Sequence, residues 1–123
     1  MTILIVDDNP AMRRAIRYFL GDLGEFHECS DGSEALDAYT TFHPDWVLMD
    51  IRMPVLDGLS ATRQIMAADA NARVLIVTDY DDKQLRSAAT GAGACGYIVK
   101  SDLVTLRAIL GSQPDQLTRG EAL

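Results

Sequence analysis

The chain has 123 residues and a mass of 13.4 kDa, enough to bury a hydrophobic core and too short for a second sizeable domain. With 48% hydrophobic and 24% charged residues, its composition is that of a compact globular protein and excludes a low-complexity chain. The 11 Lys and Arg residues against 18 Asp and Glu residues give a net charge of -7, which disfavours nonspecific binding to nucleic acid or to an anionic membrane.

Short apolar runs typical of β-strands recur along the chain. In order they cover residues 3–6, 26–29 (a weaker run), 46–49, 74–77 and 97–99. None approaches the roughly 20 apolar residues that cross a bilayer, so no membrane span is expected. The N-terminus enters the first run without a basic region and a long apolar segment before it, so export is not predicted.

Helical spacing of apolar residues fills the gaps between these runs. Inward-facing positions are expected at Met12, Ile16, Phe19, Leu20 and Leu23, at Ala35, Ala38, Tyr39 and Phe42, at Ala61, Ile65 and Ala68, at Leu85, Ala88, Ala89 and Ala92, and at Leu103, Leu106 and Leu110. Asn9 followed by Pro10 predicts the start of the first helix, with Asn9 as its cap. Asp82 and Gly93 are predicted to begin and end the fourth.

Strands and helices therefore alternate as βαβαβαβαβα. Because the strand runs are almost continuously apolar, they predict strands buried on both faces, as in a parallel sheet covered by helices. Right-handed crossovers then bring the carboxyl ends of all five strands to one edge. We predict a doubly wound five-stranded α/β domain over residues 1–111, followed by a tail or the start of a linker at 112–123, where apolar periodicity is lost.

Polar side chains stand where four of the predicted strands end. Asp7 and Asp8 follow the first strand, Asp50 the third, Thr78 the fourth and Lys100 the fifth. Acids at one strand end are commonly solvated loop residues, but these positions converge on the edge where open α/β sheets bind ligands. Three clustered carboxylates repel one another, so they indicate a bound cation. Oxygen ligands favour Mg²⁺ or Mn²⁺ over zinc.

At this point the chain resembles a known family, the receiver domains of two-component response regulators, over residues 2 to about 110. The matching segments are ILIVDDNP (3–10), SDGSEAL (30–36), DWVLMDIRMPVLDG (45–58), VLIVT (74–78) and GAGACGYIVK (91–100). The order of the segments makes the resemblance specific. It is closest to receivers that precede a helix-turn-helix output domain, and it implies a flavodoxin-like (βα)₅ fold with strand order 2-1-3-4-5.

The resemblance also implies a metal-dependent phosphoacceptor site. Asp50 would accept a phosphoryl group from a phosphohistidine on a sensor histidine kinase or a phosphotransfer protein. Asp8, Asp50 and the main-chain carbonyl of Arg52 would bind Mg²⁺ (or Mn²⁺) directly, and Asp7 would hold a metal-bound water. Lys100 would pair with the phosphoryl oxygens.

A conformational switch is implied by two further residues. Thr78 would hydrogen-bond to a phosphoryl oxygen, and Tyr97 would swing inward as Thr78 moves. In physical terms, the added charge of an aspartyl phosphate would be converted into repacking.

Three departures or variable positions are expected to modulate the site. Asp79 stands where the family usually has a small residue, so it is either a barrier to phosphodonors that favours cationic ones, or a solvated loop residue. Arg52 and Tyr80 occupy positions that influence phosphoaspartate hydrolysis in the family, and either shield the site or point to solvent. Ser101 replaces the usual Pro after Lys100, which leaves a cis or a trans bond open.

Two other groups of residues have simpler interpretations. Cys29 and Cys95 lack metal-ligand spacing and are predicted to be small buried thiols. Arg13, Arg14 and Arg17 lie on the outer face of the first helix, either as a solvated face or as a docking surface for an acidic kinase partner.

The function predicted is a cytoplasmic phosphorylation switch that controls an output domain or downstream partner, with transcription as the expected output. Its chemistry would be limited to self-phosphorylation from a phosphodonor and autodephosphorylation, so no enzymatic turnover of other substrates is expected. The resemblance allows a homodimer, and direct nucleic-acid binding by this domain is not expected. Two alternatives are a degenerate, phosphorylation-independent binding module and a Mg²⁺-dependent aspartyl-phosphate phosphohydrolase. The hydrolase is disfavoured because such enzymes carry an acid where this chain has Arg52.

Overall fold

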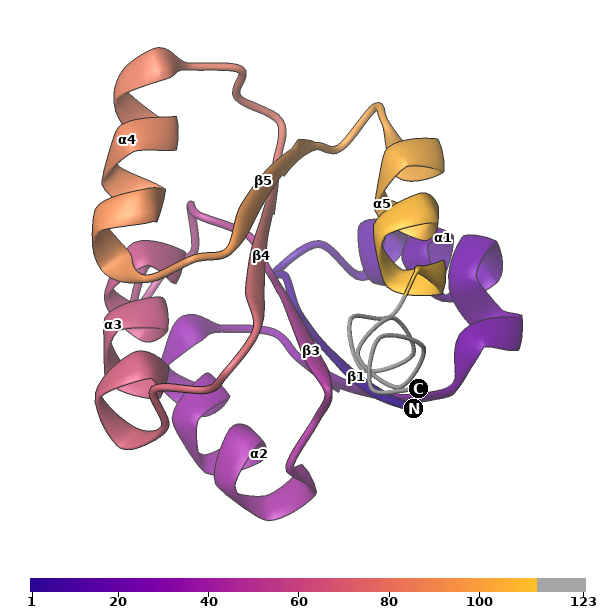
Figure 1. Ribbon diagram of the computed structural model, residues 1–123, viewed down its shortest axis with the longest axis horizontal. Coiled ribbons are helices and arrows are strands. Elements are labelled where there is room, and N and C mark those ends of the chain that lie inside the picture. Colours follow the sequence, from indigo (N-terminus) through magenta and orange to yellow (C-terminus); the bar gives the residue numbers. More distant parts are fainter. Residues whose placement is uncertain (113–123) are drawn as a thin grey trace, which may run out of the picture.

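The computed structural model describes residues 1–112 (Figure 1). The strands are β1 (Thr2–Val6), β2 (Glu25–Cys29), β3 (Trp46–Met49), β4 (Val74–Thr78) and β5 (Gly96–Val99). The helices are α1 (Pro10–Leu20), α2 (Ala35–Phe42), α3 (Gly58–Ala68), α4 (Lys83–Ala92) and α5 (Leu103–Gly111), and short 3₁₀ turns span Gly21–Leu23 and Gly32–Glu34. The alternation of strands and helices predicted from the sequence is confirmed. The predicted tail lies, from residue 113 onward, outside the described residues.

All five strands pair in parallel in the order β2-β1-β3-β4-β5, as the resemblance implied. Helices α1 and α5 cover one face of the sheet, and α2, α3 and α4 cover the other (Figure 1). The strand order reverses direction beside β1, because the chain moves outward from β1 to β2 and then crosses to β3. The carboxyl ends of β1 and β3 are therefore neighbours at the switch point where doubly wound folds bind ligands.

Two hydrophobic layers hold the sheet between its helices. In β1, Leu4 and Val6 pack toward α2 and α3, whereas Ile3 and Ile5 pack toward α1 and α5, and all four are fully buried. Both faces of a central strand must therefore be apolar, which explains the unbroken strand runs in the sequence. Trp46 at the start of β3 also belongs to this core.

The predicted helix ends are present. The Asn9 side chain accepts a hydrogen bond from the Ala11 N–H at 2.9 Å, with Pro10 as the first helical residue. Asp82 caps α4, and Gly93 ends it at a φ of 103°, a left-handed conformation that glycine adopts without a Cβ penalty.

The fold answers two questions raised by the sequence, namely the geometry of the Lys100–Ser101 bond and the burial of the two cysteines. No cis peptide bond occurs among residues 1–112, so the Lys100–Ser101 bond is trans. Cys29 is buried as predicted, but the prediction for Cys95 was wrong, because Cys95 is exposed in the turn that leads into the edge strand β5. No helix in the described part of the chain combines the length and apolar character needed to cross a membrane.

Candidate functional site

The acidic residues gather because β1 and β3 are paired in register. Val6 lies opposite Met49, so the residues that follow these two positions, Asp7 and Asp50, leave the sheet side by side. The Asp50 N–H donates to the Val6 carbonyl at 2.9 Å, which extends the pairing to the edge where the acids lie. This register fixes the spacing of the two acids.

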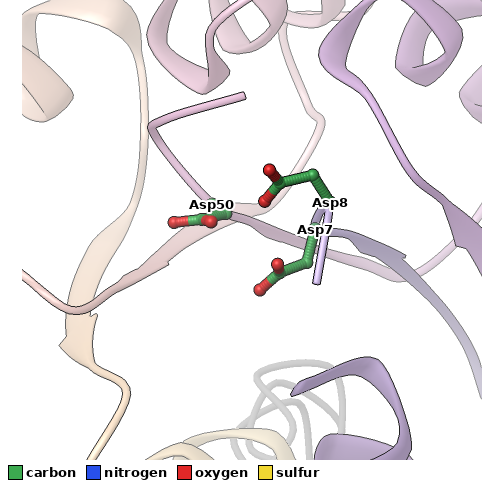
Figure 2. Close-up of side chains that lie close together, drawn as sticks. All are labelled: Asp7, Asp8 and Asp50. Carbon is green, nitrogen blue, oxygen red and sulfur yellow. The ribbon is translucent and has the colours of Figure 1, made fainter. Parts of the chain in front are cut away.

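Asp7, Asp8 and Asp50 form one cluster at this edge. Each offers a carboxylate oxygen, and the three oxygens lie within 4.8 Å of one another. Asp7 and Asp50 are only 2% and 7% exposed, whereas Asp8 is open to solvent. Their side chains extend to the same side of the strand ends (Figure 2). The solvent-exposed side of the cluster, where Asp8 lies, therefore gives a cation access to Asp7 and Asp50.

Lys100, which follows β5, brings an ammonium group to the buried pair. Its Nζ lies 2.9 Å from Asp7 Oδ2 and 3.1 Å from Asp50 Oδ2. Burial by itself would lower the Lys100 pKa, but the hydrogen bond to Asp7 and the charges of both acids outweigh it and raise the pKa. Lys100 therefore keeps its positive charge at neutral pH.

The charges at the site do not balance. Burial, and then the negative charge of Asp7, raise the Asp50 pKa, although Lys100 and the Ile51 N–H, 2.8 Å from Asp50 Oδ1, act in the opposite direction. Three carboxylates face one ammonium group, which leaves the cluster short of positive charge. Its exclusively oxygen donors match Mg²⁺ or Mn²⁺, so the residues present fit a hard divalent cation.

Thr78 ends β4 beside this cluster and is fully buried. Its main-chain carbonyl accepts the Lys100 N–H at 2.7 Å, and its hydroxyl lies 3.5 Å from the Tyr80 nitrogen, a long contact. The Tyr97 hydroxyl donates to the Tyr80 carbonyl, and the Arg86 guanidinium carbon lies 4.5 Å from the centroid of the Tyr97 ring. The segment after Thr78 is thereby tied to Tyr97.

Arg52 and Tyr80 come from different loops and meet above the strand ends. Arg52 follows Asp50 by two positions, and its guanidinium carbon lies 4.5 Å from the centroid of the Tyr80 ring. Both are exposed, so neither is part of the core, and the pair joins the β3–α3 and β4–α4 loops. Asp79, between Thr78 and Tyr80, is also exposed.

The arginines of α1 are less available than a free docking surface requires. Arg13 and Arg17 pair with Glu28 of β2 at 2.8 and 2.6 Å, whereas Arg14 forms no ion pair with any residue in the described part of the chain. Arg13 also donates to the Asp7 carbonyl at 2.6 Å. Arg13 therefore supports the loop that carries two of the clustered acids, a role that helical spacing could not reveal.

The sequence prediction also missed Asp31, in the loop between β2 and α2. Its carboxylate accepts main-chain N–H groups from Val55 and Leu56, both in the loop that follows Asp50. The only signal in the sequence was the SDGSEAL segment, which carried the family resemblance but no stated role.

The sequence comparisons agree with this geometry. The model of the response regulator receiver domain matches residues 3–110. The chain is 39% identical over 99 residues to the chemotaxis protein CheY of Halobacterium salinarum, covering 80% of this chain and 82% of that protein. It is 39% identical over 101 residues to the response regulator MprA of Mycobacterium avium, covering 81% of this chain but only 44% of that longer protein.

Solved structures show the same likeness. A LuxR-family two-component response regulator from Aurantimonas sp. matches with a TM-score of 0.79 and 33% identity, covering 93% of this chain and 90% of that chain. CheY of Borrelia burgdorferi, solved in complex with CheX, BeF₃ and Mg²⁺, matches with a TM-score of 0.78 and 28% identity, covering 85% and 84% of the two chains. With the sheet order, the acidic edge and these relatives taken together, the chain belongs to the response regulator receiver domain family of two-component systems.

Proposed function

We propose that Asp50 is the phosphoacceptor of this receiver and that its phosphorylation switches the domain between two conformations. One observation carries the proposal: acids from β1 and β3 and the lysine after β5 meet at one edge of the sheet, with Lys100 3.1 Å from Asp50. Solvated loop acids would have no reason to share a buried ammonium group.

The reaction follows from this arrangement. An Asp50 carboxylate oxygen forms the new P–O bond while the P–N bond to the donor imidazole breaks, and the imidazole nitrogen keeps the electron pair. Because an anionic carboxylate approaches an anionic phosphoryl group, catalysis depends mainly on positioning and charge neutralisation. The Lys100 ammonium, held by Asp7 and Asp50, supplies one positive charge at the point of transfer.

A divalent cation supplies the remaining charge neutralisation when bound. Asp8, Asp50 and the main-chain carbonyl of Arg52 are the ligands we propose for Mg²⁺, with Mn²⁺ as the alternative, and Asp7 would hold a metal-bound water. The support is the set of three carboxylate oxygens within 4.8 Å of one another, with Asp8 accessible from solvent.

The switch is proposed to run through Thr78 and Tyr97. A phosphoryl group on Asp50 offers a charged acceptor to the Thr78 hydroxyl, which within residues 1–112 makes a long contact of 3.5 Å with the Tyr80 nitrogen. Movement of Thr78 toward the phosphoryl group would displace Tyr80 and so disturb the bond between the Tyr97 hydroxyl and the Tyr80 carbonyl. Tyr97 already packs, partly buried, against the hydrophobic core, and would then be free to turn further inward.

Three exposed residues are proposed to tune the lifetime and formation of the phosphoaspartate. Arg52 and Tyr80, stacked on each other, would hinder the approach of water to Asp50. The Asp79 carboxylate would repel anionic phosphodonors, since it is exposed and immediately follows Thr78.

The partners proposed are a sensor histidine kinase or a phosphotransfer protein as donor, and an output domain or downstream partner as target. Transcriptional output is proposed because one relative is the uncharacterized transcriptional regulatory protein YxjL of Bacillus subtilis. The chain spans about half or less of the length of YxjL and of MprA. A homodimer and a cytoplasmic location remain part of the proposal, as do a domain over residues 1–111 and a tail or linker over 112–123.

The test is to incubate the protein with Mg²⁺ and acetyl phosphate and to measure its intact mass. We expect a gain of one phosphoryl group in the parent and none in Asp50→Asn, which keeps the shape of the side chain but lacks the nucleophile. Asp8→Asn should reduce the gain without abolishing the fold. A parent that gains no mass, or an Asp50→Asn variant that gains as much, would contradict the proposal and favour a phosphorylation-independent binding module.

A further inference from the structure

The carboxylate of Asp31 joins two loops that are far apart in the sequence. Its Oδ1 accepts the Ser33 N–H at 2.9 Å, within its own β2–α2 loop, and the Leu56 N–H at 3.1 Å. Its Oδ2 accepts the Val55 N–H at 3.1 Å. Both carboxylate oxygens are thus used, and two of the three donors belong to the loop that follows the phosphoacceptor.

Backbone packing brings the same two loops into contact. A Cβ atom built on Gly32 would lie 2.2 Å from the Leu56 carbonyl oxygen and 3.2 Å from the Asp57 oxygen. Gly32 is buried, so no side chain separates the loops. The Asp31 carboxylate therefore lies at a contact between two main chains, where its geometry is tightly constrained.

The loop that Asp31 holds is the one between Asp50 and α3. At its base, the Gly58 N–H donates to the Ile51 carbonyl at 2.7 Å. At its far side, Val55 and Leu56 are fixed by Asp31. Arg52 lies between these two points, and its carbonyl is the main-chain ligand that we assign to the divalent cation.

The bonds also keep Asp31 ionised. The N–H of Ser33 contributes most to lowering the Asp31 pKa, and the N–H groups of Leu56 and Val55 lower it further. Hydrogen bonds from amides to a charged acceptor are stronger than neutral ones. The connection between the loops is therefore made by a group well suited to hold main chain in place.

We propose that Asp31 is a positioning residue for the phosphoacceptor site. Through Val55 and Leu56 it holds the β3–α3 loop so that the Arg52 carbonyl is already placed for the cation before the cation binds. This inference rests on the proposed function, since it assigns a role toward the cation bound by Asp8 and Asp50. Without Asp31 the loop must be ordered at the moment of binding, and the ordering cost weakens the cation affinity.

The two variants Asp31→Ala and Asp31→Asn separate positioning from charge. Both remove one negative charge, so a purely electrostatic effect on Mg²⁺ binding would be equal in the two. Asp31→Asn keeps an oxygen at the Oδ1 position, which accepts from Ser33 and Leu56, and loses the acceptor for Val55. Asp31→Ala loses all three bonds.

A matched control is available at Asp69, just beyond α3 and therefore at the opposite edge of the sheet from the acidic cluster. Its carboxylate accepts from the Tyr39 hydroxyl at 2.8 Å and from the Asn71 N–H at 2.9 Å. Asp69→Asn removes the same charge and disturbs a comparable hydrogen-bonded carboxylate, but touches no residue of the loop after Asp50.

The experiment is a Mg²⁺ titration followed by NMR, with amide hydrogen exchange of Val55 and Leu56 measured in the absence of metal. We expect the Kd for Mg²⁺ to rise about tenfold in Asp31→Ala, the equivalent of one lost hydrogen bond to a charged group. A rise of less than about threefold is expected in Asp31→Asn, and no change in Asp69→Asn. Exchange of both amides should accelerate in Asp31→Ala, and mainly that of Val55 in Asp31→Asn.

Each other outcome overturns the inference. An unchanged Kd in Asp31→Ala, or equal weakening in the alanine and asparagine variants, removes the positioning role. Weakening in Asp69→Asn would show a general loss of stability. If Asp31→Ala does not fold, the selective exchange of Val55 in Asp31→Asn, with its smaller rise in Kd, decides the question. Failure of the parent to bind Mg²⁺ or to gain phosphate would instead refute the proposed function, and the positioning role with it.

Discussion

The guanidinium group of Arg52 lies over the ring of Tyr80, with 4.5 Å between its carbon and the ring centroid. Each residue follows a proposed site residue by two positions, Arg52 after Asp50 and Tyr80 after Thr78. The contact therefore bridges two loops at the edge where the acids gather. It is an exposed cation–π pair, a type of contact that typically contributes about 0.5–1 kcal/mol.

Breaking this contact is expected to shorten the life of the phosphoaspartate. Arg52→Ala and Tyr80→Ala should each lose phosphate about three- to fivefold faster than the parent, because water reaches Asp50 more easily. The decay is measured by intact mass after removal of the phosphodonor. Since both changes break one contact, the double variant should decay little faster than the quicker single variant. If the double variant decayed faster by the product of the two single effects, shielding by the Arg52–Tyr80 pair would be contradicted.

Removing the charge of Asp79 is expected to speed phosphorylation by an anionic donor. Asp79→Asn should gain phosphate from acetyl phosphate about two- to threefold faster than the parent at low salt, because an exposed like charge is removed. The advantage should shrink at about 1 M salt, where screening extends over only a few ångströms. Equal rates at low salt would identify Asp79 as an ordinary solvated residue.

Neutralising Asp50 is expected to stabilise the metal-free protein. Burial and the charge of Asp7 raise the Asp50 pKa, so folding favours the protonated carboxyl group. At neutral pH the charged carboxylate therefore destabilises the folded protein. This contribution to stability is present at low pH and is lost as pH rises through the folded pKa. Asp50→Asn should raise the free energy of unfolding at pH 7 by on the order of 1 kcal/mol.

Mg²⁺ provides the control for this prediction. Thermal unfolding should show a rise in Tm with added Mg²⁺ for the parent and a much smaller rise for Asp50→Asn, because a ligand that binds only the folded state stabilises it. An Asp50→Asn variant that is less stable than the metal-free parent would show that the Lys100 pair outweighs the cost of burying the charge.

Loss of the Thr78 hydroxyl is expected to separate phosphorylation from switching. Thr78→Ala should still take phosphate on Asp50 but shift to the active conformation poorly. A hydrogen bond to a charged group contributes about 1.5–3 kcal/mol, so the ratio of active to inactive conformers should fall about 10- to 100-fold. Release of Tyr97 from the Tyr80 carbonyl can be followed by NMR of the tyrosine rings. Thr78→Ser keeps the hydroxyl and should switch; equal switching by the alanine variant would exclude Thr78 as the link.

The two cysteines are expected to differ in their reactivity toward thiol reagents. Burial, and then the charge of Glu34, raise the pKa of Cys29 from its ordinary 9.0 to about 11. A thiol reagent at pH 8 should modify only exposed Cys95, and Cys95→Ser should abolish the reaction of the folded protein. Modification of Cys29 under native conditions would contradict its burial.

The raised pKa of Cys29 also predicts a loss of protein stability at alkaline pH. The Cys29 pKa is higher in the folded protein than in the unfolded chain, so the unfolded chain releases the thiol proton first as the pH rises. The contribution of Cys29 to the free energy of unfolding is therefore complete below pH 9 and is lost as the pH rises toward 11. The loss amounts to about 2–3 kcal/mol. Denaturant unfolding at pH 8 and pH 10.5 should show a smaller fall for Cys29→Ala than for the parent. The Tyr39 pKa, raised to about 12 chiefly by burial, affects both proteins equally.

Much of the fold could be predicted from the sequence because it depends on local patterns. Continuous apolar runs indicate strands buried on both faces, and Asn9–Pro10 marks a helix start by providing a cap and a residue that needs no N–H partner. The same alternation places Asp7, Asp8, Asp50 and Lys100 at strand ends. Their assembly at one edge was predictable, since parallel strands share a direction.

Other features depend on contacts that no local pattern encodes. Cys29, between Glu28 and Ser30, is buried at the end of β2, whereas Cys95, between Ala94 and Gly96, is exposed in the turn before β5, so the flanking residues did not indicate which thiol is buried. Arg13 and Arg17 have helical spacing typical of a solvated face, but β2 lies next to α1 and presents Glu28 to both. Contacts between segments distant in the sequence decided these outcomes.

The sequence by itself therefore determined the elements, the edge at which the acids meet and the family resemblance. Only the tertiary structure decided that Lys100 contacts both Asp7 and Asp50, and that Asp31 holds the loop at Val55 and Leu56. These contacts join residues that are between 24 positions (Asp31 and Val55) and 93 positions (Asp7 and Lys100) apart in the sequence. Their geometry follows from sheet register and loop packing, which arise only when the whole core is assembled.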